Sequence, residues 1–206
     1  SELDFISDLV IDSNEPFINI YDYYTDQFVW PRGLPLEYIL GQDKVKAIGG
    51  DRKEIGVIQG LADLEPDVDA IYRLVINKQI TFEKRDRTLY LKPNTYTPFN
   101  SQNTFWNVKA FPFLYLPVRV RFRVCDILRS YIAQRLMWAF NLHLGFSQAT
   151  VYQNRNEHDL IKDFEDELDC YTSMPKICEA IAEIDLPKDK IDAQLAIYKK
   201  LENKGF

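Results

Sequence analysis

The chain has 206 residues, 46% of them hydrophobic and 14% aromatic, a composition that supports a folded core and excludes a disordered protein. Its formal net charge of −6 argues against a general nucleic-acid binder, because such proteins need a basic surface to neutralise phosphates. No apolar run reaches the roughly 18 residues that a membrane-spanning helix requires, and the acidic start is unlike a signal peptide. The chain opens at Ser1, which suggests a processed or excised piece or simple removal of an initiator Met.

The N-terminal half predicts short strands separated by irregular segments. Residues 17–24, FINIYDYY, indicate a short strand, and residues 30–35, WPRGLP, indicate a rigid turn. Residues 54–60 and 69–76 are rich in apolar and β-branched side chains and predict two further strands. A hairpin is predicted over residues 80–92.

The C-terminal half predicts one long helix, one strand and a helical tail. Residues 124–140 place apolar side chains at the i, i+3, i+4, i+7 spacing of an amphipathic helix, and residues 145–153 predict a strand. Further helices are predicted over residues 159–170, 175–184 and 188–204, the last closed by Gly205. The pattern as a whole indicates an α/β fold.

The cysteines favour buried thiols over a metal site. Cys125, Cys170 and Cys178 form no Cys-x-x-Cys pair, and only His143 and His158 accompany them. A structural zinc site is therefore not expected. A disulfide between Cys170 and Cys178 is the alternative to free, buried thiols.

Five sequence blocks, taken in order, carry a family resemblance. They are Phe28–Ile39, Val57–Leu74, Pro98–Trp106, Val120–Leu136 and Gln153–Tyr171. Their order and spacing resemble the STELLO family of glycosyltransferases, Golgi type II membrane proteins whose plant members associate with cellulose synthase. A fainter similarity links the chain to the reversibly glycosylated polypeptides, which are nucleotide-sugar mutases.

The resemblance implies a mixed-sheet α/β fold like that of the A-type glycosyltransferases (GT-A). Residues 1–155 would form this domain without its N-terminal nucleotide-binding half, and residues 156–206 would form a C-terminal helical segment. The implied activity is transfer of a sugar from a nucleotide-diphosphate sugar to a hydroxyl acceptor in the Golgi lumen. The alternative is a non-catalytic interaction or assembly module that binds a protein partner through its C-terminal helices, since no Gly-rich phosphate loop precedes Trp30.

The segment TPFNSQNTFW places four neutral polar side chains, Asn100, Ser101, Gln102 and Asn103, between aromatic residues. Amide groups suit sugar hydroxyls because they offer a donor and an acceptor on one planar group. The residues alone favour a turn whose side chains cap backbone groups. With the resemblance, we expect these four residues to bind the donor sugar.

A second candidate region surrounds the predicted strand over residues 54–60. Gln59 and Gly60 are expected to contact the donor, because a glycine at the end of a strand permits close backbone approach to a ligand. Asp67 and Asp69 superficially match the Asp-x-Asp motif that holds a metal against a diphosphate. The resemblance places the family's metal-binding cluster upstream of the WPRG block, so capping and a solvated turn are the favoured roles of this pair.

Asp126 lies near the start of the predicted long helix, where the resemblance places the base that takes the proton of the acceptor hydroxyl. Arg123 and Arg129 would bind the donor diphosphate or set the ionisation of Asp126. Spacing alone explains Asp126 by the helix dipole and by an ion pair with Arg129, three residues later. The resemblance favours the catalytic role.

A divalent metal, Mn²⁺ or Mg²⁺, is expected in the full-length enzyme. Related enzymes often use a late histidine as a ligand, which makes His158 a candidate. A surface position in the first turn of the following helix is the alternative for His158. Glu2, Asp4 and Asp8 are not arranged as the acidic cluster of the family.

Overall fold

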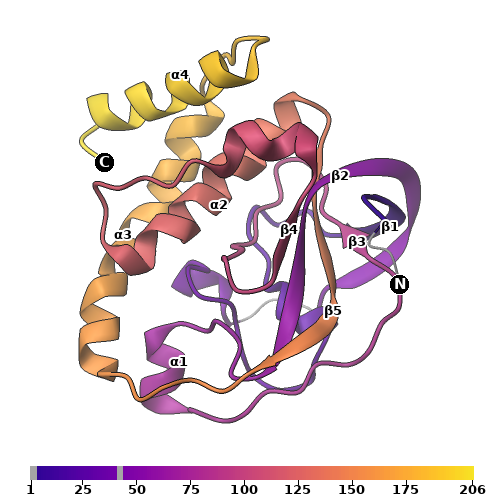
Figure 1. Cartoon of the computed structure of the whole chain (residues 1–206), viewed down its shortest axis with the longest axis vertical. Helices are drawn as coiled ribbons and strands as arrows, with labels where there is room; N and C mark the ends of the chain where they lie inside the picture. The colour runs from indigo at the N-terminus through magenta and orange to yellow at the C-terminus, as the bar shows by residue number, and fades with distance from the viewer. Residues whose placement is uncertain (1–3, 41–43) are drawn as a thin grey trace.

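A mixed five-stranded sheet organises the computed structural model, which describes residues 4–40 and 44–206 (Figure 1). The strand order is β1-β3-β5-β2-β4. The strands are β1 (Ile6–Asp12), β2 (Lys46–Leu64), β3 (Leu89–Tyr90), β4 (Thr104–Trp106) and β5 (His143–Gln153). Glu2 lies outside the described residues.

The strand β2 makes the most pairings in this sheet, because it pairs with three other strands. Its first half runs antiparallel to β1, from Lys46 opposite Asp12 to Glu54 opposite Ile6. Its second half runs parallel to β5 and antiparallel to β4. The apolar run that predicted a strand over residues 54–60 is therefore confirmed, and the exposed residues before it extend the strand through their backbone pairing with β1.

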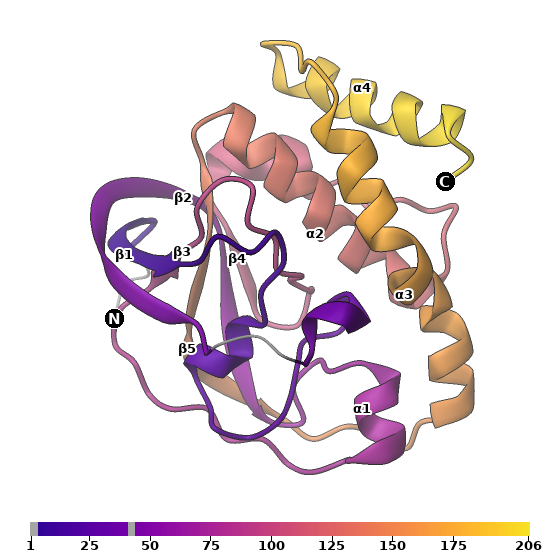
Figure 2. The same ribbon diagram turned by 180° about the vertical axis from the view of Figure 1, so that it is seen from behind.

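The α-helices lie mainly on one side of the sheet. They are α1 (Ala70–Val75), α2 (Phe122–Ala139), α3 (Leu160–Ala182) and α4 (Lys190–Asn203). Short 3-10 helices cover Ile20–Tyr23 (η1), Leu36–Tyr38 (η2) and Val108–Leu114 (η3). Figures 1 and 2 show α2 and α3 side by side, with α1 next to the first turns of α3. Within the described residues, no helix is both long and apolar enough to cross a bilayer.

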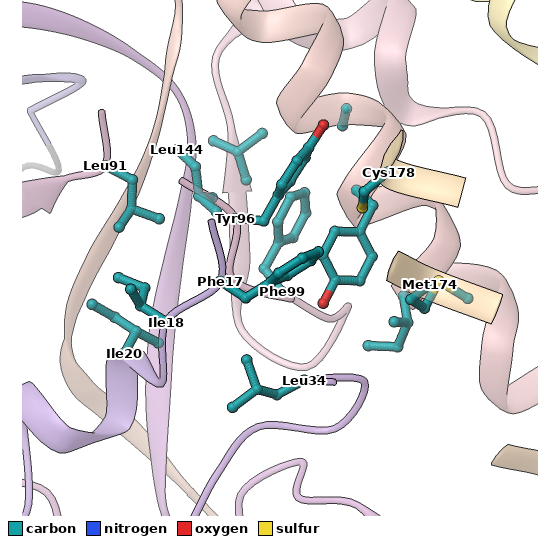
Figure 3. Packing of buried hydrophobic residues seen from close by; sticks show 14 of the residues in the cluster. Phe17, Ile18, Ile20, Leu34, Leu91, Tyr96, Phe99, Leu144, Met174 and Cys178 are labelled. Carbon is teal, nitrogen blue, oxygen red and sulfur yellow. The ribbon is translucent and has the colours of Figure 1, made fainter. Parts of the chain in front are cut away.

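The larger hydrophobic cluster joins the sheet to the helical tail. Figure 3 shows Phe17 and Phe99 between the side chains of the strand region and Met174 and Cys178 of α3. The same cluster continues into α4 through Ile197. Residues 156–206 thus share one core with the residues before them. The three cysteines are free thiols, and Cys170 and Cys178 are buried, as the composition predicted.

Two strand predictions in the N-terminal half are wrong because local capping favours helical turns. Residues 17–24 contain η1, where the Asn19 side chain accepts a hydrogen bond from the Tyr21 N–H at 3.2 Å. Residues 69–76 contain α1, which begins because the Asp69 side chain accepts the Tyr72 N–H at 2.8 Å.

The predicted hairpin over residues 80–92 is also wrong. Ile80 forms an isolated bridge with Leu64, and β3 pairs with β1 and β5 instead of with its neighbour in sequence. The rigid turn over residues 30–35 is confirmed: the Leu34 N–H donates to the Pro31 carbonyl at 3.3 Å.

The helix and strand predictions in the C-terminal half are confirmed, with one change. The α2 and β5 boundaries lie within two residues of those predicted. The helices predicted over residues 159–170 and 175–184 form a single helix, α3, with Pro175 inside it. Buried side chains on both sides of Pro175, Met174 and Ile177 among them, hold the two halves on the same core despite the missing backbone donor.

Candidate functional site

Segments far apart in the sequence meet at an open cavity of about 290 Å³. The turn that follows Trp30, the segment between β2 and α1, the loop before β4, the start of α2, the end of β5 and the loop after it all contribute side chains. The residues that line the cavity are Arg32, Asp67, Ser101, Gln102, Asp126, Gln153, Arg155, Asn156 and His158.

The turn that carries Arg32 lies directly on α2. Gly33 has a φ of +88°, and a Cβ at this position would come within 2.3 Å of a methyl group of Ile127. Only glycine fits both constraints. The Tyr131 hydroxyl also donates to the Gly33 carbonyl at 2.8 Å. This packing places the Arg32 side chain beside Asp126.

Arg32 binds two carboxylates at once. Its Nε donates to both oxygens of Asp67, at 3.1 and 3.0 Å, and its Nη2 donates to Asp67 Oδ2 at 2.7 Å. The same Nη2 lies 3.1 Å from each oxygen of Asp126. Its Nη1 donates to the backbone carbonyl of Arg123. The Arg32 guanidinium is thus engaged through all three of its nitrogens.

Asp67 is a buried ionic centre and not a solvated turn residue. Burial by itself would raise the pKa of Asp67, but Arg32, Arg155 and Arg73 outweigh it and hold this pKa well below its usual range. Arg155 donates to Asp67 Oδ1 at 3.2 Å, and Arg73 lies 3.9 Å from the same oxygen. The role predicted for Asp67 is therefore corrected: the carboxylate anchors the arginines of the site.

Asp69 caps α1, as one sequence interpretation expected, and it also accepts a hydrogen bond from the Trp30 indole. The side chain is fully buried. Burial, with a smaller contribution from the charge of Glu167, raises the pKa of Asp69 to about 7. Asp69 therefore faces the protein interior and does not line the cavity.

Asp126 lies within the first two turns of α2, as predicted, and its side chain is 14% exposed. The Ser101 N–H donates to Asp126 Oδ2 at 3.3 Å, which joins the polar loop to the carboxylate. The ion pair that spacing predicted with Arg129 is replaced by the pair with Arg32.

Arg129 contacts the polar loop through Ser101 and the neighbouring ring of Trp106. Its Nη2 donates to the Ser101 hydroxyl at 2.9 Å, and its guanidinium carbon lies 5.3 Å from the centre of the Trp106 ring. Burial lowers the pKa of Arg129, and the charge of Asp126 opposes this effect. Arg129 is thus placed to position Ser101, and it does not line the cavity.

Arg123 points away from the cavity, toward α3. Its Nε donates to Glu167 Oε1 at 2.7 Å, and its Nη1 lies 3.4 Å from Asp163. Glu167 is fully buried and also accepts the Ala70 N–H at 2.7 Å and the Tyr171 hydroxyl at 2.8 Å. Arg123 therefore ties α2 to α3, and the expectation that it faces a donor diphosphate is corrected.

Gln59, Gly60 and Asn103 form the support of the polar loop. The Gln59 amide donates to the carbonyls of Gly60 and Asn103 at 2.8 and 3.2 Å. The Asn103 amide donates to the Leu61 carbonyl at 3.0 Å and to the Thr150 hydroxyl at 2.9 Å. A Cβ on Gly60 would lie 2.5 Å from Asn103 Nδ2, so the close approach that requires glycine is made by Asn103 and not by a ligand.

The polar loop divides into two pairs of side chains. Asn100 and Asn103 are buried and hydrogen-bond within the protein, with the Asn100 N–H donating to Gln59 Oε1 at 2.9 Å. Ser101 and Gln102 line the cavity together with Asp126. The interpretation of these residues as one site predicts that the four loop side chains, Gln59 and Asp126 line one cavity. Ser101, Gln102 and Asp126 do so, whereas Asn100, Asn103 and Gln59 do not.

His158 lines the cavity, with its Nδ1 at 3.2 Å from Asp163 Oδ2. Among the described residues, no group of three or more His, Cys, Asp or Glu side chains is arranged to hold a metal ion. The nearby carboxylates of Asp67 and Asp126 are already bound by arginine. The described side chains therefore do not fit a metal site.

Arg32, Gln153, Arg155 and Asn156 belong to the site but were not identified as site residues from the sequence. Arg32 lies in the WPRG block and Arg155 in the QNRNEH segment, both of which carried the family resemblance. Their presence in those blocks was the available signal. Their role depends on pairing with Asp67 across the fold, which spacing does not reveal.

A family model described as STELLO glycosyltransferases matches residues 123–203, which include Asp126 and His158. Over 174 residues the chain is 29% identical to "Probable glycosyltransferase STELLO2" of Arabidopsis thaliana, and the alignment covers 80% of this chain and 22% of that protein. Over 148 residues it is 30% identical to "Probable glycosyltransferase STELLO1" of the same plant, with 68% of this chain and 19% of that protein covered.

The chain is a relative of the STELLO glycosyltransferases. The resemblance carried by the five sequence blocks is thereby confirmed, and the mixed α/β fold is consistent with it. The chain is a glycosyltransferase-like protein that spans about a fifth of the length of these curated relatives.

Proposed function

We propose that this chain forms the acceptor-side part of a GT-A active site that transfers a sugar from a nucleotide-diphosphate sugar to a hydroxyl acceptor. The observation that carries the proposal is the position of Asp126, on a cavity at the start of α2, where the family resemblance expects the base. By the same resemblance, we place the full-length form in the Golgi lumen. A divalent metal remains an expectation for the full-length enzyme only.

Asp126 is held in a geometry suited to proton transfer. A carboxylate offers about four lone-pair sites, and Arg32 and the Ser101 N–H use three of them. The remaining site accepts the proton of the acceptor hydroxyl. As this O–H bond breaks, the acceptor oxygen bonds to the anomeric carbon, and the bond from that carbon to the nucleotide diphosphate breaks with its electron pair on the diphosphate. Arg32 and Ser101 keep Asp126 in place through this step.

A second candidate function, an interaction module, is favoured by one surface feature. An apolar groove of about 840 Å³ lies between α4, the start of α2 and residues 115–120, with Tyr115, Val118 and Leu195 among its lining. Val118 is 83% exposed, and Leu195 is 48% exposed. A protein partner docked there would use the C-terminal helices, and that function would not require Asp126.

The test compares transfer by a longer form that contains this chain with transfer by its Asp126→Asn variant. Losing a general base should lower turnover by about 10²–10⁴, whereas donor binding should change much less. Asp192→Asn is the matched control, because Asp192 lies in the first turn of α4 and away from the cavity. Turnover that is equal in the Asp126→Asn variant and the control would remove the catalytic role and favour the interaction module.

A further inference from the structure

The charged side chains around the cavity are already paired with one another. Arg32 binds Asp67 and Asp126, and Arg155 binds Asp67 together with the carbonyls of Glu65 and Pro66. Further ion pairs form among described residues that do not line the cavity. Arg73 and Arg123 pair with Asp163, and Arg123 also pairs with Glu167.

This network balances four arginines with four carboxylates: Arg32, Arg73, Arg123 and Arg155 with Asp67, Asp126, Asp163 and Glu167. Binding a diphosphate requires cationic donors that are free to form charge-assisted hydrogen bonds. In this cavity a diphosphate would compete with Asp67 and Asp126 for Arg32 and Arg155, and displacing either carboxylate would leave a buried charge unpaired at a high energetic cost.

The uncharged side chains of the cavity are, in contrast, available. Within the described residues, the side-chain amides of Gln102 and Asn156 have no hydrogen-bond partner, and both line the cavity. The Gln153 amide donates to the Asn154 carbonyl at 3.2 Å, which leaves its Oε1 free to accept. The Ser101 oxygen accepts from Arg129, so its own proton remains free to donate.

We propose that this cavity is the subsite for one neutral sugar unit of the acceptor, and that Gln102, Gln153 and Asn156 determine which sugar fits. The inference rests on the proposed function and deepens it, because it assigns the site to the acceptor and excludes the donor diphosphate. Amides and a hydroxyl with free donors or acceptors line the same cavity as Asp126, which matches the donors and acceptors of sugar hydroxyls. The volume of about 290 Å³ is at the lower limit of the roughly 300–1,000 Å³ typical of ligand pockets, which suits one sugar ring and not a complete nucleotide sugar.

The experiment is an NMR titration of the ¹⁵N-labelled chain with single methyl glycosides of the common hexoses and pentoses. Inorganic diphosphate and uridine diphosphate, both without metal, are titrated separately. We expect at least one glycoside to shift the amide signals of residues 101–102 and 153–156, with a dissociation constant on the order of 1–100 mM, typical of a few hydrogen bonds in water. We expect the diphosphates to leave these signals unchanged.

Alanine variants test which side chains of the cavity bind the glycoside. Gln102→Ala and Asn156→Ala should each weaken the glycoside about two- to tenfold, the usual effect of losing one hydrogen bond. Asn203→Ala is the control, because Asn203 is an exposed amide at the end of α4 and does not line the cavity. Equal affinities in all three variants would contradict the assignment of these residues.

Two outcomes overturn the subsite itself. One is a shift of the cavity signals by diphosphate, which would make this a donor site and leave the proposed transfer activity standing. The other is the absence of any shift at these signals with every glycoside up to about 0.1 M. Failure of the proposed function is seen separately, as unchanged turnover of the longer Asp126→Asn form.

Discussion

Arg32 holds both carboxylate oxygens of Asp126 at 3.1 Å, although 94 residues separate the two in sequence. The same guanidinium binds Asp67, three residues after the end of β2. One side chain therefore joins the turn that follows Trp30, the segment between β2 and α1, and the helix that carries the proposed base. Burial would lower the pKa of Arg32, but Asp67 and Asp126 raise it well above its usual range, so Arg32 stays charged.

Arg32→Gln should lower the free energy of unfolding by about 3–5 kcal/mol at pH 7, because it removes, among the described residues, the one ion pair of the largely buried Asp126 and the shortest of the ion pairs of Asp67. The free energy of unfolding of Arg32→Lys should lie between those of wild type and Arg32→Gln, since an ammonium keeps the charge but cannot reproduce the planar fork of the guanidinium. Urea unfolding followed by circular dichroism measures both variants. Arg52→Gln is the control at an exposed arginine of β2, and a loss no larger than that of the control would show that the pairing does not stabilise the fold.

Gly60→Ala should disturb the support of the polar loop, although Gly60 itself does not line the cavity. The added Cβ would meet Asn103 Nδ2 at 2.5 Å and force it from its bonds to Leu61 and Thr150. We expect a loss of about 1–3 kcal/mol in the free energy of unfolding, equivalent to two hydrogen bonds. Gly49→Ala is a matched control in the same strand, because nothing lies within 4 Å of a Cβ there. A loss equal to that of the control would mean that the loop does not depend on Asn103.

The elements that the sequence predicted correctly are those that periodicity alone specifies. The apolar stripe of α2 matches its buried side chains, including Ile127 and Leu136, and the apolar runs of β2 and β5 match buried strand positions. The strand predicted over residues 69–76 was wrong. The β-branched and aromatic residues of this segment favour a strand, whereas the cap by Asp69 and burial against α3 favour a helix.

The candidate site was predictable only in part. Asp126, Ser101, Gln102 and His158 were identified because the family resemblance marks their blocks, and the structure brings them to one cavity. Arg32 and Arg155 could not be identified by spacing, since each acquires its role from Asp67, which lies in another segment. The amides of the polar loop are alike in the sequence, and only the fold separates the buried ones from those that reach the cavity.

Stability should depend on pH through Asp69. Burial raises the pKa of Asp69 from an ordinary value near 3.8 to about 7, so the folded chain keeps a proton that the unfolded chain releases. The stabilising contribution of the protonated form is complete below pH 3.8 and is lost as the pH rises toward 7, by up to about 1.4 kcal/mol per pH unit. Urea unfolding of wild type and Asp69→Asn at several pH values measures it. We expect wild type to lose stability relative to the variant between pH 4 and 7, and a constant difference would contradict the raised pKa.

Binding of a nucleotide-diphosphate sugar to this chain should not depend on Mn²⁺. The described residues offer no group of three or more metal-binding side chains, and the carboxylates beside the cavity are neutralised by arginine. Calorimetric titration of the 206-residue chain with uridine-diphosphate sugars, with and without Mn²⁺, should therefore give the same weak or undetectable heats. His158→Ala should behave as wild type, because the imidazole faces Asp163. Tight binding that requires Mn²⁺ would place a metal site in this chain, and Asp67, Asp69 and His158 would then be the residues to mutate first.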